Sequence, residues 1–317
     1  MDAEAFRLDA AEDLRRVVPF DAFCWPLTDP ETTASSVAVA AVPFWEAVPQ
    51  MLRLQARKHA TLLDGPTVWS PTAADRSTDA WTQVFGPHGV TDELTAVLAD
   101  EFGCWGYLEL WRTGGAFTDA ERDSVRARIP ALTAPLRAAQ AAAFSAPAPS
   151  LGDELDGPAV MVLGPSGEVH STTAAAQAWA KRLAPLQLRH GMEVPGVAFS
   201  LAARAALCLG KAMVRLQVAE GVCLTLQASP MSGGDIAVTF EQASTADRIE
   251  VLGRACGLTP RERQLLSLLP TGSDTRHLAK ALGITEATVQ QHFKAVHAKV
   301  GVNSRTELLA RVSGRVV

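Results

Sequence analysis

Residues 259–300 read TPRERQLLSLLPTGSDTRHLAKALGITEATVQQHFKAVHAKV, and signals for three successive helices can be found in them. Thr259-Pro-Arg-Glu262 combines a hydroxyl N-cap, a proline at the first helical position and a capping-box glutamate, so a helix begins here. A short second helix is expected from 274 or 275 to 282, because Gly283-Ile-Thr285 then supplies a tight turn and a new N-cap. The third helix is expected over 286–300.

The third helix divides into two faces when its positions are placed about 100° apart. One face is apolar and should be buried; it comprises Val289, Phe293, Val296 and Val300. The opposite face is small or polar and has no acidic group; it comprises Ala287, Gln290, Gln291, Lys294 and Ala298. An ordinary surface helix tends to carry mixed charges there, so the pattern favours a helix that enters a DNA groove.

The polar face has the residue types that a DNA major groove requires. Gln290 and Gln291 can pair with base edges, with adenine as the geometric favourite, and Lys294 can reach guanine or phosphate. Thr285 and Thr288 can offer hydroxyls to phosphate beside the positive end of the helix. These five residues are the predicted DNA-binding residues, and double-stranded DNA is the predicted partner.

The charge of the chain is unevenly distributed. The formal net charge is −5, but residues 257–317 contain nine Lys/Arg and four Asp/Glu, a charge of +5, which leaves −10 for the rest. A small basic end is suited to phosphate, whereas an acidic body is repelled by it. A solvated basic tail would give the same count, so the charge supports the prediction without deciding it.

The remainder of the chain is long enough for further domains, since 317 residues exceed the usual domain length of about 100 to 200. A Pro- and Ala-rich stretch at 145–156 is interpreted as a linker, and 244–257 as a short connecting helix. Residues 1–144 mix helix and strand signals. Residues 157–243 read as strand, turn, strand, helix, helix and three strands, with the helices over 174–183 and 197–211. Both regions are expected to be α+β modules.

Six of the seven tryptophans lie in residues 1–144. They are consistent with an aromatic-lined pocket in this module. A core that they simply fill is the more common arrangement, and the sequence leaves both interpretations open.

The C-terminal region resembles the LuxR-type, or NarL-type, helix-turn-helix domain. The matching residues are Leu258-Thr-Pro-Arg-Glu262, Gly272, Leu278-Ala279, Leu282-Gly-Ile-Thr285, Thr288-Val289, His292, Lys299-Val-Gly-Val302, Ser304-Arg305 and Glu307-Leu308. The resemblance implies an all-α four-helix domain over 258–317 that binds DNA as a homodimer, with the third helix in the major groove. It also implies that the fourth helix pairs the subunits through Arg305, Leu308, Leu309 and Val312. This chain departs from many members at Gln290, where they have Lys, and at Thr275, where they have Asn.

The preceding regions are similar, more diffusely, to actinobacterial regulators with a GAF-like module followed by a PAS-like module. Short matches lie at Asp92-Glu-Leu94 and Gly103-Cys-Trp-Gly106 in the first region, and at Asp156-Gly-Pro158 in the second. The resemblance implies a GAF-like domain over 1–144 and a PAS-like domain over 157–243, which sense a small-molecule effector or a protein partner, or mediate dimerisation. The acidic pair, phosphorylatable Asp and Lys of a receiver domain are not found before residue 134, so phosphorelay control is not expected.

Several other classes of protein are disfavoured. The chain has no Gly-x-Ser-x-Gly, Gly-x-x-x-x-Gly-Lys or His-Glu-x-x-His motif, so neither an enzyme nor a metal site is predicted, and no cofactor is proposed. No run of about 18 apolar residues and no signal-peptide pattern occurs, so a soluble cytoplasmic protein with no membrane contact is expected.

Two hypotheses of function remain. In the first, the chain is a DNA-binding transcription regulator whose N-terminal modules respond to a ligand or partner. In the second, it is a ligand-binding or protein-interaction regulator whose helix-turn-helix contributes little specific DNA binding. Gln290, Thr275 and the acidic body keep the second hypothesis open.

Overall fold

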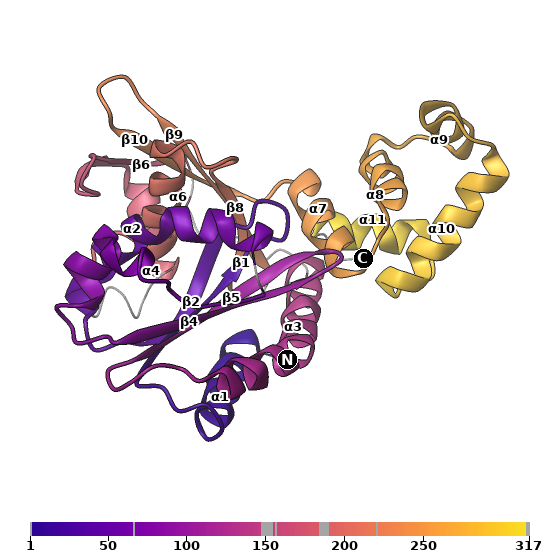
Figure 1. Cartoon of the computed structure of the whole chain (residues 1–317). Coiled ribbons are helices and arrows are strands. Elements are labelled where there is room, and N and C mark those ends of the chain that lie inside the picture. The colour runs from indigo at the N-terminus through magenta and orange to yellow at the C-terminus, as the bar shows by residue number, and fades with distance from the viewer. Residues whose placement is uncertain are drawn as a thin grey trace. The chain divides into compact units, whose positions relative to one another are not determined.

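The computed structural model describes residues 2–65, 67–146, 155, 157–183, 190–219 and 221–314, which form two compact units (Figure 1). Unit 1 comprises Met1–Leu136, Leu151–Leu216 and Leu226–Glu241. Unit 2 comprises Arg137–Ser150, Gln217–Thr225 and Gln242–Val317. Most of the expected linker, at 147–154 and 156, lies outside the described residues. The chain is thus a mixed α/β protein that ends in a helical region.

The first sheet of unit 1 has five strands in the order β2-β1-β5-β4-β3. The strands are β1 (Ala22–Thr28), β2 (Ser35–Ala41), β3 (Val68–Trp69), β4 (Asp92–Asp100) and β5 (Gly103–Arg112). All of the described neighbour pairs are antiparallel. The central strand β5 is buried from Cys104 to Trp111. Most positions of β5 are large and apolar, as expected for a strand that is covered on both faces.

Three long helices accompany this sheet: α1 (Ala3–Arg15), α2 (Val48–Thr61) and α3 (Asp119–Ser145). The Arg7 guanidinium of α1 donates to the carbonyls of Trp25 and Val37, at 2.6 and 2.9 Å, and so fixes α1 against β1 and β2. A capping box begins α3, since the Glu121 carboxylate accepts from the Thr118 amide and the Thr118 hydroxyl accepts from the Glu121 amide. Unexpectedly, α3 continues through Pro130 and Pro135.

The second sheet also has five strands, in the order β7-β6-β10-β9-β8. The strands are β6 (Ala159–Leu163), β7 (Val169–Thr172), β8 (Met213–Ala219), β9 (Val222–Pro230) and β10 (Ile236–Gln242), with helices α4 (Ala174–Leu183) and α6 (Gly196–Ala206) between β7 and β8. The predicted order of elements is confirmed. The prediction that the second helix reaches Lys211 is wrong, because Cys208 and Gly210 have φ values of 52° and 71°, which end a right-handed helix.

The two sheets have the same strand order when each is numbered from its own first strand. No internal repeat is visible in the sequence. Strand order depends on which strands pair, and many different sequences satisfy the same pairing. The structural repetition is therefore visible only in three dimensions.

Unit 2 contains the connecting helix and the four helices expected from the sequence. They are α7 (Thr245–Ala255), α8 (Pro260–Ser267), α9 (Thr275–Leu282), α10 (Glu286–Val300) and α11 (Arg305–Ser313). Figure 1 shows α8 to α11 as the orange and yellow helices at the end of the chain. Their buried residues form one hydrophobic core that includes Leu265, Leu278 and Val289, each 0% exposed. In the described ranges no helix combines the length and apolar character needed to cross a membrane.

Candidate nucleic-acid interface

The start of α8 is fixed by the predicted capping box. The Thr259 hydroxyl accepts from the Glu262 amide, and the Glu262 carboxylate accepts from the Thr259 amide at 2.7 Å. The same carboxylate contacts the Lys299 ammonium at 2.7 Å, which ties α8 to the end of α10. Burial by itself raises the pKa of Glu262, but the bonds from Lys299 and Thr259 outweigh burial and hold this pKa below its ordinary value. The ionised Glu262 therefore stabilises the arrangement of α8 and α10.

Replacing Glu262 by Ala should lower the free energy of unfolding of unit 2 by roughly 1–2 kcal/mol, because a cap and a partly buried ion pair are lost together. Since folding lowers the pKa of Glu262 from its ordinary value of 4.5, its stabilisation is present above that pH and disappears as the pH falls below it. Denaturant unfolding at pH 7 and at pH 3 would measure both effects. A wild-type advantage equal at the two pH values would contradict the ionic role.

The turn between α9 and α10 is built as the sequence predicts. Gly283 ends α9 with φ 64°, a left-handed conformation that glycine adopts without strain. The Ile284 amide donates to the Ala279 carbonyl at 3.0 Å, and the Thr285 hydroxyl accepts from the Thr288 amide at 3.1 Å as the N-cap of α10. These local bonds set the direction in which α10 leaves α9.

The two faces of α10 are as predicted. Its apolar face is buried in the core of unit 2, with exposed fractions of 0, 6, 1 and 6% for Val289, Phe293, Val296 and Val300. The opposite face is exposed; it comprises Ala287, Gln290, Gln291, Lys294 and Ala298. The helix therefore presents two amides and one cation, without an acidic side chain, on the side away from its own core.

The five predicted DNA-binding residues differ in whether their side chains already have a hydrogen-bond partner within the domain. Gln291 and Lys294 are exposed. The Gln290 amide donates to the Thr275 hydroxyl on α9 at 3.3 Å, so it already has one partner. The hydroxyls of Thr285 and Thr288 lie 2.8 Å apart and bond to each other at the start of α10. Gln290 and Thr275, the two departures from the usual pattern of the resembled family, are thus in contact.

Two basic residues on α9 are not among the predicted DNA-binding residues. Arg276 and Lys280 are exposed, and α9 packs against α10. The bond between Thr275 and Gln290 places the start of α9 beside the exposed face of α10. Both residues were counted in the charge of the segment. A signal for them was present, because they lie outside the apolar stripe of α9 at Leu278, Ala279 and Leu282.

The expected dimer contact on α11 needs correction. Leu308 and Val312 are 0% exposed and lie in the core of unit 2, so their side chains cannot also form a contact between subunits. Arg305 is partly exposed; its guanidinium donates to the Ser273 carbonyl and lies 5.5 Å from the centre of the Phe293 ring. Leu309 is partly buried against the same core. Of the four residues, only Arg305 and Leu309 keep exposed surface.

Comparison with known proteins identifies this region. Residues 257–312 match the model of the luxR family of bacterial regulatory proteins. A putative HTH-type transcriptional regulator of Aeromonas salmonicida is 49% identical over 51 residues, which are 16% of this chain and 26% of that protein. The nitrate/nitrite response regulator NarL of Escherichia coli K12 is 44% identical over 50 residues, 16% and 23% of the two chains. MctR, a transcriptional regulatory protein of Rhizobium johnstonii, is 40% identical over 52 residues, 16% and 24%. The C-terminal region is a LuxR-family helix-turn-helix domain, and the chain matches about a quarter of each of these relatives.

Solved structures of SdiA align over most of this chain at low similarity. SdiA in complex with octanoyl-rac-glycerol aligns with 99% of this chain and 88% of its own, at 13% identity and a TM-score of 0.33. Another structure, of Escherichia coli SdiA, aligns with 100% and 93% of the chains, at 14% identity and a TM-score of 0.29.

Proposed function

We propose that this chain is a transcription regulator that binds double-stranded DNA by placing α10 in the major groove. The observation that carries the proposal is the exposed, non-acidic face of α10 in a LuxR-family helix-turn-helix domain. The charge of +5 over residues 257–317 supports it, because phosphate attraction supplies much of the affinity of such domains for DNA.

The exposed residues of α10 and α9 divide into two roles. Within the described residues, Gln291 and Lys294 make no side-chain hydrogen bond that DNA would have to replace. They would contact base edges, where one good contact contributes about 1–3 kcal/mol of discrimination. Gln290 would contact DNA while it remains bonded to Thr275, or would exchange that bond. The Thr285 and Thr288 hydroxyls, at the positive end of α10, and the cations of α9 would bind phosphate.

A homodimer would place two copies of α10 on half-sites one helical turn apart, with Arg305 and Leu309 as the candidate contacts on α11. The two α+β modules of unit 1, interpreted as GAF-like and PAS-like, would sense a small molecule or a protein partner in the cytoplasm. Their acidic charge would keep them away from the duplex.

Replacing both Gln291 and Lys294 by Ala should abolish sequence preference and weaken specific binding by roughly 10-fold or more, since each base contact contributes about 1–3 kcal/mol. The measurement is a gel shift on the preferred duplex, obtained by selection from a random pool, at several salt concentrations. If Lys294 contacts phosphate instead, its replacement alone should reduce the salt slope by about one unit.

Gln177 and Lys181 provide a matched control, because they are an exposed glutamine and lysine on α4 of unit 1. Their double replacement by Ala should leave DNA binding unchanged. A protein that selects no sequence from the pool would contradict the proposal. If DNA is bound but the α10 variant still regulates transcription normally in cells, the interaction-regulator hypothesis is favoured.

A further inference from the structure

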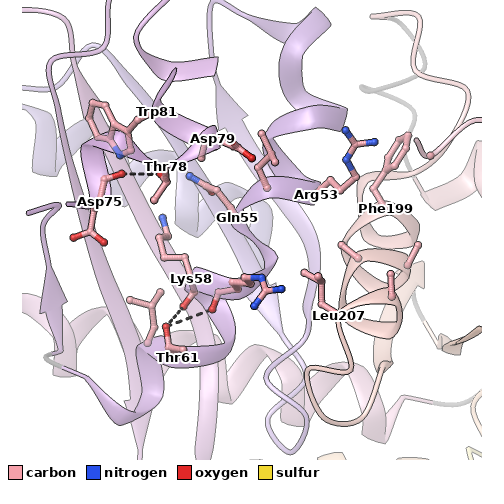
Figure 2. A pocket seen from close by; sticks show the side chains of 18 of the residues that line it. Arg53, Gln55, Lys58, Thr61, Asp75, Thr78, Asp79, Trp81, Phe199 and Leu207 are labelled. Atoms are coloured by element: carbon pink, nitrogen blue, oxygen red, sulfur yellow. Dashed lines mark hydrogen bonds between the residues drawn. The ribbon is translucent and has the colours of Figure 1, made fainter. Parts of the chain in front are cut away.

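Unit 1 contains a cavity of about 880 Å³ that is large enough for a small-molecule ligand. Its walls come from α2, from residues 75–85, from Trp69 on β3 and from Phe199 and Leu207 at α6 (Figure 2). The helices α2 and α6 pack against each other. The cavity therefore lies where the first α+β module meets the second within the same compact unit.

The side chain of Gln55 in this wall has no hydrogen-bond partner. Gln55 lies on α2, is 2% exposed, and both its amide nitrogen and its amide oxygen are buried and unpaired in the described structure. Figure 2 shows it among the lining residues, between Lys58 and Asp79. A buried amide without partners costs about 1–3 kcal/mol for each group left unsatisfied. A leucine of similar size would fill the same space without that cost.

The walls around Gln55 are largely aromatic and aliphatic. Trp69, Trp81 and Phe199 are among the lining residues, and Phe199 lies on α6. The Lys58 ammonium, 5.3 Å from the centre of the Trp69 ring, is neutralised by Glu93 and by Glu109 at 2.6 and 2.7 Å. Flat aromatic walls favour a planar ligand, since ring systems stack on them.

The charges of the lining side chains cancel. The cationic residues are Arg53, Arg57 and Lys58, and the anionic ones are Asp75, Asp79 and Glu93. A ligand of either net charge would gain little from such a balanced lining and would lose its hydration on entry. The cavity thus fits a neutral ligand better than an ionic one.

We propose that this cavity binds a neutral, planar molecule that presents an N–H beside a C=O, as a lactam or a nucleobase does, to the amide of Gln55. A carboxamide offers one acceptor and donors side by side, so a lactam edge can satisfy both groups with two hydrogen bonds. The ring would stack against Trp69, which is partly exposed. This inference rests on the proposed function, because it names the class of effector that unit 1 senses.

The test uses the full chain and two probes, 2-quinolinone and uracil, titrated by calorimetry. A matched compound, 2-methoxyquinoline, has the quinoline outline but lacks the N–H donor. At least one probe should bind the wild-type protein, and 2-methoxyquinoline should bind at least about 10-fold more weakly than 2-quinolinone. Gln55→Leu should weaken probe binding by about 10-fold or more, whereas Gln177→Leu on exposed α4 should not change it.

A second readout separates this role from a purely structural one. Because Gln55→Leu removes two unsatisfied buried groups, the variant without ligand should have a higher Tm than the wild type. A lower Tm would show that the amide has partners in the folded protein and would overturn the inference. Failure of both probes to bind, as expected if only water pairs with Gln55, would also overturn it. DNA binding by α10 is measured separately, so neither failure affects the proposed DNA-binding role.

Discussion

Replacing Phe293 by Ala should lower the free energy of unfolding of unit 2 by about 3–5 kcal/mol, the usual cost of deleting a buried aromatic ring. Phe293 is 6% exposed and lies in the core formed by α7 to α11. Its ring also faces the Arg305 guanidinium at 5.5 Å, so the substitution removes a cation–π contact as well as apolar burial. Because α10 is held in place by this face, DNA binding should fall together with stability.

The two units can be followed separately in the full chain. All seven tryptophans lie in unit 1, at positions 25, 45, 69, 81, 105, 111 and 179. Denaturant unfolding measured by tryptophan fluorescence therefore reports unit 1, whereas unit 2 contributes only to circular dichroism at 222 nm. We expect Phe293→Ala to shift the unfolding transition of unit 2, which appears in circular dichroism but not in tryptophan fluorescence.

Gln291→Ala is the control, since it lies on the exposed face of the same helix and should change stability by less than about 0.5 kcal/mol. Equal losses of stability in the two variants would contradict the assignment of the two faces.

Replacing Lys58 by Met should lower the free energy of unfolding of unit 1 by about 3–5 kcal/mol, because it leaves two buried carboxylates without their cation. The Lys58 ammonium lies 2.6 Å from Glu93 and 2.7 Å from Glu109, whose side chains are 1% and 2% exposed. The His59 ring contacts Glu109 at 3.0 Å and is unchanged in this variant. The effect should appear in the tryptophan fluorescence transition.

The pH dependence of the Lys58 variant follows from the two carboxyl groups. Burial raises the pKa of Glu93, and Lys58 opposes that rise, so removing Lys58 should raise it further. A carboxyl whose pKa is higher in the folded state binds more protons there, and stability then increases as the pH falls. The variant should therefore regain stability as the pH is lowered from 7, because Glu93 takes up a proton above its ordinary range.

Two further variants sharpen the test. Adding Glu93→Gln to Lys58→Met removes one uncompensated charge and should recover at least about 1 kcal/mol. Arg57→Met, at the exposed neighbouring position on α2, should have little effect. If Lys58→Met were as stable as Arg57→Met, the buried ion pairs would not stabilise unit 1.

The faces of α10 could be predicted because they depend on short-range geometry. The period of 3.6 residues fixes which side chains share a side, and Thr285 and Gly301 mark the ends of the helix locally. The capping box of Thr259 and Glu262 was predictable for the same reason. These signals are contained within stretches of fewer than 20 residues.

The dimer contact predicted for Leu308 and Val312 on α11 depends on long-range packing, which short-range geometry does not determine. Leu308 and Val312 form an apolar stripe, and a stripe shows that something covers it without showing whether the cover is the same chain or a second one. The structure shows that the core of unit 2 covers them. The end of α6 was missed because it depends on the left-handed backbone at Cys208, a residue type with no preference for that conformation.

By itself the sequence determined the helices of the C-terminal domain, their order and the side that α10 presents, because hydrogen bonds and side-chain periods within one helix set these features. Only the tertiary structure decided which distant residues meet. Lys58 reaches Glu93 and Glu109, 35 and 51 positions away, and Gln55 is left without a partner in the wall of a cavity. Such meetings depend on how strands pair and how helices pack on them, and residue spacing along the chain carries no record of that choice.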